Sequence, residues 1–194
     1  MATSNTKTYA MKMVLEYAKV FKENADYGDA ESAQKWLRDL AKNGGQTAVN
    51  AYFTSEEQLQ GFLQSGYERM TINPKTNEEV DTIKEGNQEY GIGKYLQLKR
   101  KIIDVREYKD RKTGEFLEVD FGGIPTVIDI REGEENKRLW DYECDGELGH
   151  GTEAYVEFEV YKGTQRRLKN LAVVNLVEYE GETETENSMF KVGS

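Results

Sequence analysis

The chain has 194 residues and a net charge of −10, and 32% of its residues are charged while 37% are hydrophobic. This balance excludes a disordered chain, and no apolar run approaches the roughly 20 residues of a membrane-spanning helix. The single cysteine, Cys144, excludes an intrachain disulfide and fits a reducing compartment. Residues 1–8 are polar and lack the apolar segment of a secretory signal. We therefore expect a soluble globular protein with one large domain, or one domain plus an elaboration.

The first predicted elements are a strand at residues 12–21 and a helix at residues 30–42. The strand alternates apolar side chains loosely, and the helix begins after Asp29, a residue type that often caps helix N-termini. Trp36 shares one face of this helix with leucines. A tryptophan on such a face usually packs in the core, so we expect Trp36 to be buried.

A second strand and a second helix follow. Residues 47–53 are predicted as the strand, and Thr54 with Glu57 forms a capping box at the start of the helix. Residues 1–75 are therefore predicted to form an N-terminal strand-helix-strand-helix elaboration. The polar residues that follow, up to Gln88, predict a linker or a surface loop.

The second half of the chain has β character. Short apolar or alternating segments are separated by Gly-rich turns at hairpin spacing, a pattern typical of a small closed β-barrel. The predicted strands are residues 95–106, 116–119, 126–130, 154–161 and 168–179. The predicted fold class is mainly β with an α/β elaboration. It has a five-stranded OB-fold-like barrel over residues 76–180, the elaboration packed on that barrel, and a flexible acidic C-terminal tail at residues 181–194.

Basic residues concentrate in one segment of this acidic chain. Between Gly91 and Lys112, eight cations are set against three anions, which gives a local charge of +5. Tyr95 and Tyr108 are interleaved with the cations. Cations on an extended ribbon contact phosphates and rings stack on unpaired bases, so the segment predicts a surface for single-stranded nucleic acid. A solvated hairpin whose lysines prevent edge-to-edge aggregation is the alternative that this pattern leaves open.

Acidic residues concentrate at the C-terminal end. From Glu178 onward glutamates alternate with other residues, and residues 178–194 carry a net charge of −4. The run ends in Met189 and Phe190, an apolar pair that can dock on a partner or on the basic segment. We therefore expect a partner-binding tail. Its residues are Glu182, Glu184, Glu186 and Phe190.

Several fragments, taken in order, resemble one family. They are residues 17–26 (Tyr-Ala-Lys-Val-Phe-Lys-Glu-Asn-Ala-Asp), 44–46 (Gly-Gly-Gln), 93–100 (Gly-Lys-Tyr-Leu-Gln-Leu-Lys-Arg), 122–129 (Gly-Gly-Ile-Pro-Thr-Val-Ile-Asp), 140–141 (Trp-Asp), 148–152 (Leu-Gly-His-Gly-Thr) and 167–179 (Arg-Leu-Lys-Asn-Leu-Ala-Val-Val-Asn-Leu-Val-Glu-Tyr). This order is similar to that of the single-stranded DNA-binding proteins of tailed bacteriophages, over most of residues 17–179. The resemblance implies an OB fold and an acidic tail. It also implies a protein that coats single strands during phage DNA replication and recombination in the cytoplasm of the bacterial host.

The resemblance and the basic segment together predict a non-catalytic site for single-stranded DNA, with no cofactor and no metal. Strand alternation puts Lys99 and Lys101 on one face and Arg100 on the other. The predicted nucleic-acid-binding residues are Lys94, Tyr95, Lys99, Arg100, Lys101, Arg106, Tyr108, Lys109, Arg111, Lys112 and Trp140. The expected partners are single-stranded DNA and, through the tail, phage replication proteins. A homodimer is left open, and no membrane contact is expected.

Two other functions stay open at this point. Asp129, Glu157, Glu159 and Lys162 loosely resemble the acidic cluster with which phage nucleases hold Mg²⁺ and a water. Glu157 and Glu159 share a strand face, although alternating glutamates on a solvent face are far commoner. The third reading is a protein-binding module without nucleic acid. The sequence favours the DNA-binding protein, which is not an enzyme, over both.

Overall fold

The computed structural model describes residues 6–67, 73–74, 91–162 and 165–178. Strand makes up 46% and helix 17% of the structure, so the predicted mainly β class is confirmed. The strands are β1 (Lys7–Lys19), β2 (Gln46–Tyr52), β3 (Asn73–Pro74), β4 (Lys94–Lys101), β5 (Val105–Lys109), β6 (Phe116–Asp120), β7 (Thr126–Asp129), β8 (Arg138–Leu139), β9 (Glu153–Tyr161) and β10 (Gln165–Asn175). The helices are α1 (Lys35–Lys42), α2 (Glu56–Phe62) and α4 (Tyr142–Asp145), with a π-helical turn at Leu63–Tyr67 and a 3₁₀ turn at Glu134–Asn136. Within this described part, no helix is both long enough and apolar enough to cross a membrane.

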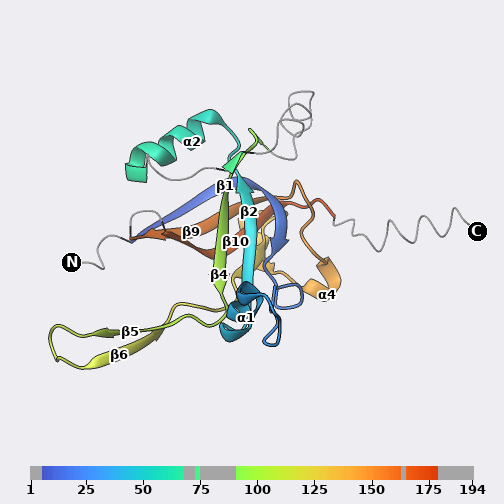
Figure 1. The fold of residues 1–194 in the computed structure, drawn as a ribbon. Helices are drawn as coiled ribbons and strands as arrows, with labels where there is room; N and C mark the ends of the chain where they lie inside the picture. The colour runs from blue at the N-terminus through green and yellow to red at the C-terminus, as the bar shows by residue number, and fades with distance from the viewer. Residues whose placement is uncertain (1–5, 68–72, 75–90, 163–164, 179–194) are drawn as a thin grey trace, which may run out of the picture.

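Among the described residues, eight strands form one mixed sheet in the order β3-β4-β2-β1-β9-β10-β7-β8. The β10–β7 pair is parallel, and the pairs on either side of β1 are antiparallel. β5 and β6 form a separate hairpin that projects from the lower end of β4 in Figure 1. β1 and β2 lie between β4 and β9, so the boundary predicted near residue 75 falls within a single sheet.

The core lies against the inward face of this sheet. In β9, the predicted alternation holds, because Ala154, Val156, Phe158 and Val160 are all fully buried. Helix α2 adds the ring of Phe62, whose centroid lies 5.9 Å from that of Phe158. Figure 1 shows α2 above β1, near the upper end of β2, and α1 at the lower end of β2. The two helices therefore lie at opposite ends of β2.

The helix starts differ locally from the predictions. Asp29 does not cap α1, because its Oδ1 accepts a hydrogen bond from the backbone two residues on (2.9 Å). The N-cap of α1 is Gln34, which makes no side-chain capping bond. The N-cap of α2 is Ser55, whose Oγ accepts from Gln58 N (3.0 Å), while Gln58 Oε1 accepts from Thr54 N (2.9 Å). The capping chemistry of α2 is thus of the predicted kind, displaced by one residue.

A closed barrel is not found among the described residues, since no backbone ladder joins β4 to β10. Two arginine side chains bridge these strands instead. Arg100 Nη1 donates to Lys169 O (3.2 Å), and Arg166 Nε donates to Gln97 O (3.1 Å). The sheet therefore curves far enough to bring β4 and β10, which are separated by three strands in the sheet order, within reach of one arginine side chain.

The strand predicted at residues 95–106 is interrupted. β4 ends at Lys101, and the backbone then bonds to the loop that follows α1, with Ile103 N donating to Asn43 O (2.8 Å). The chain resumes as β5 and turns at residues 110–115, close to the predicted turn. The base of the hairpin is anchored by Arg167, which is 7% exposed and lies over the rings of Phe121 (4.9 Å) and Tyr161 (4.5 Å).

Candidate nucleic-acid interface

A basic groove lies between helix α1 and the outward face of β2 and β4. Its volume is about 460 Å³. The lining residues are Lys19, Asp26, Trp36, Asp39, Leu40, Asn43, Gln46, Ala48, Gln97, Lys99 and Lys101. They come from β1, β2, β4, α1 and the connection between β1 and β2. We call this surface the basic groove.

The pleat of β4 sets which of its side chains enter the basic groove. Leu96 and Leu98 are fully buried on the inward face, while Gln97, Lys99 and Lys101 point outward. On β2, the residues opposite the two lysines are short or uncharged: Lys99 pairs with Ala48, and Lys101 with Gln46. The ammonium groups therefore have open space above the sheet.

Trp36 lies at the basic groove and is 58% exposed, so the prediction that it packs in the core is wrong. Helix α1 is only eight residues long and buries none of them fully. Its apolar side rests on the chain that precedes it, where Asp29 N donates to Leu37 O (2.9 Å). Gly28, at φ 67°, packs so closely on α1 that a Cβ there would collide with Leu37 O. The helix is thus fixed in position while its indole faces the groove.

The anions of the basic groove are partly neutralised. Asp39 Oδ2 lies 2.8 Å from Lys35 Nζ, and this hydrogen bond lowers the pKa of the exposed Asp39 carboxyl. Asp26 is tied into the backbone, where its N and O exchange hydrogen bonds with Gln46 (3.0 and 2.8 Å) and its Oδ1 accepts from Gly28 N (3.1 Å). Counted over the lining, Lys19, Lys99 and Lys101 outnumber the two aspartates, so the groove carries a net charge of +1.

Trp140, the predicted stacking ring, lies in the core and is 8% exposed. Its Nε1 donates to Gly146 O (2.9 Å), and the guanidinium of Arg131 lies 5.0 Å from its ring centroid. A ring with both its polar atom and its face occupied is not available to a base. The structure thus reverses the burial that the sequence analysis expected for the two tryptophans, since Trp36 is exposed and Trp140 is buried.

Two predicted cations have structural partners. Arg100 faces away from Lys99, as alternation predicts, and donates to Gly122 O (2.9 Å) as well as bridging to β10; burial lowers its pKa. Arg106 pairs with Asp104 (3.2 Å) and donates to Tyr161 OH (3.4 Å); the hydrogen bond to Asp104 raises its pKa. These guanidiniums hold the sheet and the hairpin base together and do not line the basic groove.

The other predicted residues lie on either side of the basic groove. At one end of β4, Lys94 pairs with Glu56 (3.6 Å), and the half-buried Tyr95 packs on Tyr52 with ring centroids 4.8 Å apart. Beyond the opposite end of β4, the hairpin exposes Tyr108 and the cations of its tip. Those cations are Lys109, Arg111 and Lys112. The predicted tail residues Glu182, Glu184, Glu186 and Phe190 lie outside the described residues.

The residues of the nuclease alternative are separated. Asp129 is buried beside Arg131 and Arg138 (2.9 Å each), and chiefly its hydrogen bond with Arg131 lowers its pKa to about 2. Asp129 shares the inward face of β7 with a buried valine, whereas Glu157 and Glu159 lie on the outward face of β9. No group of three or more possible metal ligands occurs within the described ranges.

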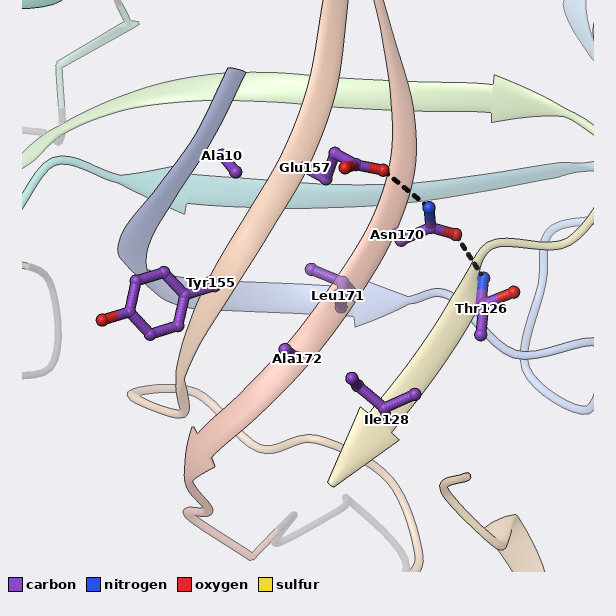
Figure 2. Close-up of a pocket in the computed structure, with 8 residues that line it drawn as sticks. All are labelled: Ala10, Thr126, Ile128, Tyr155, Glu157, Asn170, Leu171 and Ala172. Carbon is purple, nitrogen blue, oxygen red and sulfur yellow. Dashed lines mark hydrogen bonds between the residues drawn. The ribbon is translucent and has the colours of Figure 1, made fainter. Parts of the chain in front are cut away.

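Figure 2 shows a second concave surface, on the outward face of β9, β10 and β7. Its volume is about 400 Å³, and its floor is mostly apolar. Glu157 Oε1 accepts from Asn170 Nδ2 (2.7 Å), and Asn170 Oδ1 accepts from Thr126 N (3.2 Å). Tyr155 stands at its edge. The lining contains no cation, so this surface lacks the positive charge that neutralises phosphate.

The sequence analysis missed Lys19, Trp36 and Gln97 as groove residues. Gln97 carried a usable signal, because it shares the strand period of Lys99 and Lys101 on β4. Lys19 did not, because the irregularity between Glu16 and Lys19 changes which residues of β1 face outward. Trp36 carried none, since the same helical periodicity describes a core face and a groove face. No family model matches this chain, and a search of curated proteins found no significant match, so the site is defined by its geometry.

Proposed function

We propose that this protein binds single-stranded DNA, without catalysis, in the basic groove. The observation that carries the proposal is an exposed indole, Trp36, held beside Lys19, Lys99 and Lys101 on a strand surface. Lysines neutralise the phosphates of the strand, and an exposed ring stacks on an unpaired base, which a duplex does not offer.

The arrangement of the strands supports this proposal. The long strands β4, β2, β1, β9 and β10 follow one another in the sheet, and Arg100 and Arg166 bridge β10 back to β4. We infer an OB-like barrel closed by these side chains. In OB folds, the second and third strands and the connection between the first two form the oligonucleotide surface. By chain order these are β2, β4 and the segment with α1, which border the basic groove.

The hairpin extends the proposed surface beyond the groove. β5 begins four residues after Lys101, and its Tyr108 is 46% exposed opposite Leu117. We propose that Tyr108 and the tip cations contact the strand as it leaves β4. The tail remains a proposed contact for replication proteins on the grounds of its charge and its aromatic residue Phe190.

Titration of fluorescein-labelled oligothymidine, followed by anisotropy, tests the proposal. The protein should bind the single strand more tightly than a duplex of the same length, and Lys99→Glu/Lys101→Glu should weaken this binding strongly. Lys12→Glu/Lys137→Glu is the matched control, because both lysines are exposed outside the groove lining. Equal loss in both variants would indicate a general charge effect and contradict the groove assignment.

The same titration separates the alternatives. Oligouridine in place of oligothymidine measures the preference for DNA over RNA. Incubation with Mg²⁺, followed by a denaturing gel, detects cleavage, which would favour the nuclease reading. No binding to any nucleic acid would overturn the proposal and favour a protein-binding module.

A further inference from the structure

A second exposed ring lies beside the basic groove. Tyr17 is on β1, two residues before Lys19, and 59% of it is exposed. The register of β1 against β2 shifts here: Glu16 pairs with Asn50, and Lys19 pairs with Ala48. One extra residue is thus accommodated in β1 as a bulge. Bulges bend a strand and re-aim a side chain, here that of Tyr17.

The backbone of Tyr17 is in the left-handed region, with φ 50°. A bulky L-residue rarely adopts this conformation, because its Cβ approaches the following carbonyl oxygen. Among the non-glycine residues that the structure describes, only Lys162 shares a positive φ. Glycine or asparagine fits such a bulge at lower cost. Backbone strain of this kind is concentrated at functional sites, which suggests that the tyrosine ring has a functional role.

A rigid turn supports the ring. Tyr17 and His150, the only histidine of the chain, meet edge to face with centroids 4.6 Å apart. On either side of His150, Gly151 N donates to a β1 carbonyl (2.9 Å) and Gly149 N donates to Val177 O (2.8 Å). Gly149 also has no room for a Cβ, which would collide with Val177 O. The backbone of His150 therefore cannot shift without breaking these contacts.

The basic groove leads toward this ring. It crosses from Lys99 on β4, over Ala48 on β2, to Lys19 on β1. In the sheet order β4-β2-β1-β9, the next element in this direction is the turn that precedes β9, which carries His150. Tyr17 lies between Lys19 and that turn, within about 7 Å of Lys19 along the strand.

We propose that Tyr17 is a second base-stacking platform, at which the bound single strand continues from the basic groove across β1. This rests on the proposed function. Two glutamates belong to the neighbouring segments: Glu153 pairs with Val14, three residues before Tyr17, and Glu178 is bridged to Leu148, two residues before His150. Tyr17 therefore receives a base and not a phosphate. His150 positions the ring.

Three variants test the platform. Tyr17→Asn removes the ring while keeping a residue that tolerates the left-handed conformation, and Tyr17→Phe keeps the ring. Tyr155→Ala is the matched control, because Tyr155 is also exposed on the sheet but lies on β9 at the second concave surface, whose lining contains no cation. Tyr17→Asn should weaken oligothymidine binding at least about fivefold with an unchanged salt slope, while the other two variants bind as the wild type does.

Photocross-linking gives an independent readout. Oligothymidine that contains 5-iododeoxyuridine should cross-link to Tyr17 as well as to Trp36, as mapped by mass spectrometry. Wild-type affinity in Tyr17→Asn, or cross-links at Trp36 with none at Tyr17, would overturn the platform and leave the proposed function standing. Absence of single-strand binding by the wild-type protein would overturn both. Thermal unfolding of each variant distinguishes loss of the ring from loss of the fold.

Discussion

The three lysines of the basic groove set a definite salt dependence. Each phosphate contact on a single strand contributes about −0.7 to the slope of log affinity against log salt, so Lys19, Lys99 and Lys101 together give about −2. Between about 50 and 200 mM salt, these three contacts alone should make affinity for oligothymidine fall roughly 18-fold, and any contact with the hairpin cations adds to this fall. Lys99→Gln/Lys101→Gln removes two of these contacts. The slope should become less negative by about 1.4, so the fall over the same range should be roughly sevenfold smaller than in the wild type, whatever the hairpin cations contribute.

Anisotropy titrations at several salt concentrations measure these slopes. Lys12→Gln/Lys137→Gln, two exposed lysines outside the groove, should keep a slope near the wild-type value. Both variants should unfold at the wild-type temperature, because exposed lysines on a strand surface contribute little to stability. A groove variant with the wild-type slope, or a control variant with an equally reduced slope, would refute the assignment of these phosphate contacts.

The remaining predictions concern rings, a buried carboxylate and the tail. Trp36→Phe should abolish the quenching of tryptophan emission by oligothymidine, whereas Trp140→Phe should preserve the quenching because the Trp140 ring is buried. Quenching that is lost in Trp140→Phe would contradict the assignment of the basic groove as the binding site. Tyr108→Ala should weaken single-strand binding without changing the slope of log affinity against log salt, because stacking releases no counterions. A changed slope would mean that the substitution had displaced the cations of the hairpin. Asp129→Asn should lower the free energy of unfolding by about 1–2 kcal/mol at neutral pH. Hydrogen bonding to Arg131 lowers the pKa of Asp129 from 3.8 to about 2, so the contribution is full above about pH 5 and is lost as pH falls toward 2. Urea unfolding curves of the two proteins should converge there, and a constant difference would contradict this. Removing the predicted acidic tail changes the net charge by +2 and should tighten single-strand binding most at low salt; equal affinities at low salt would exclude autoinhibition.

Strand alternation was sufficient to orient many side chains before any partner strand was known. Phe158 and its neighbours at period two point inward, and Lys99 and Lys101 point outward while Arg100 does not. This follows because successive side chains on any extended strand point to opposite faces, whichever strand lies beside it. The mainly β class and the positions of β9 and the β5–β6 turn could be predicted on the same local grounds.

The two tryptophans show what only the tertiary structure decided. Trp36 lies on a regular apolar helix face, but α1 packs at one end of β2, so the ring meets solvent. Trp140 belongs to no periodic segment, yet its N donates to Val127 O (2.9 Å) and its ring is enclosed. Periodicity specifies which residues share a face, and the position of the element decides what that face meets.

The sequence pattern also could not predict which strands lie next to each other in the sheet. β1 pairs with β9, some 140 residues away, from Lys7 opposite Val160 to Val14 opposite Glu153. This pairing places the N-terminal strand in the middle of the sheet and brings Tyr17 beside His150. Backbone hydrogen bonds are the same for every residue type, so the alternation within a strand determines its two faces but not its neighbours. The choice of neighbours depends on the apolar surface that all the strands bury together, which exists only in the folded chain.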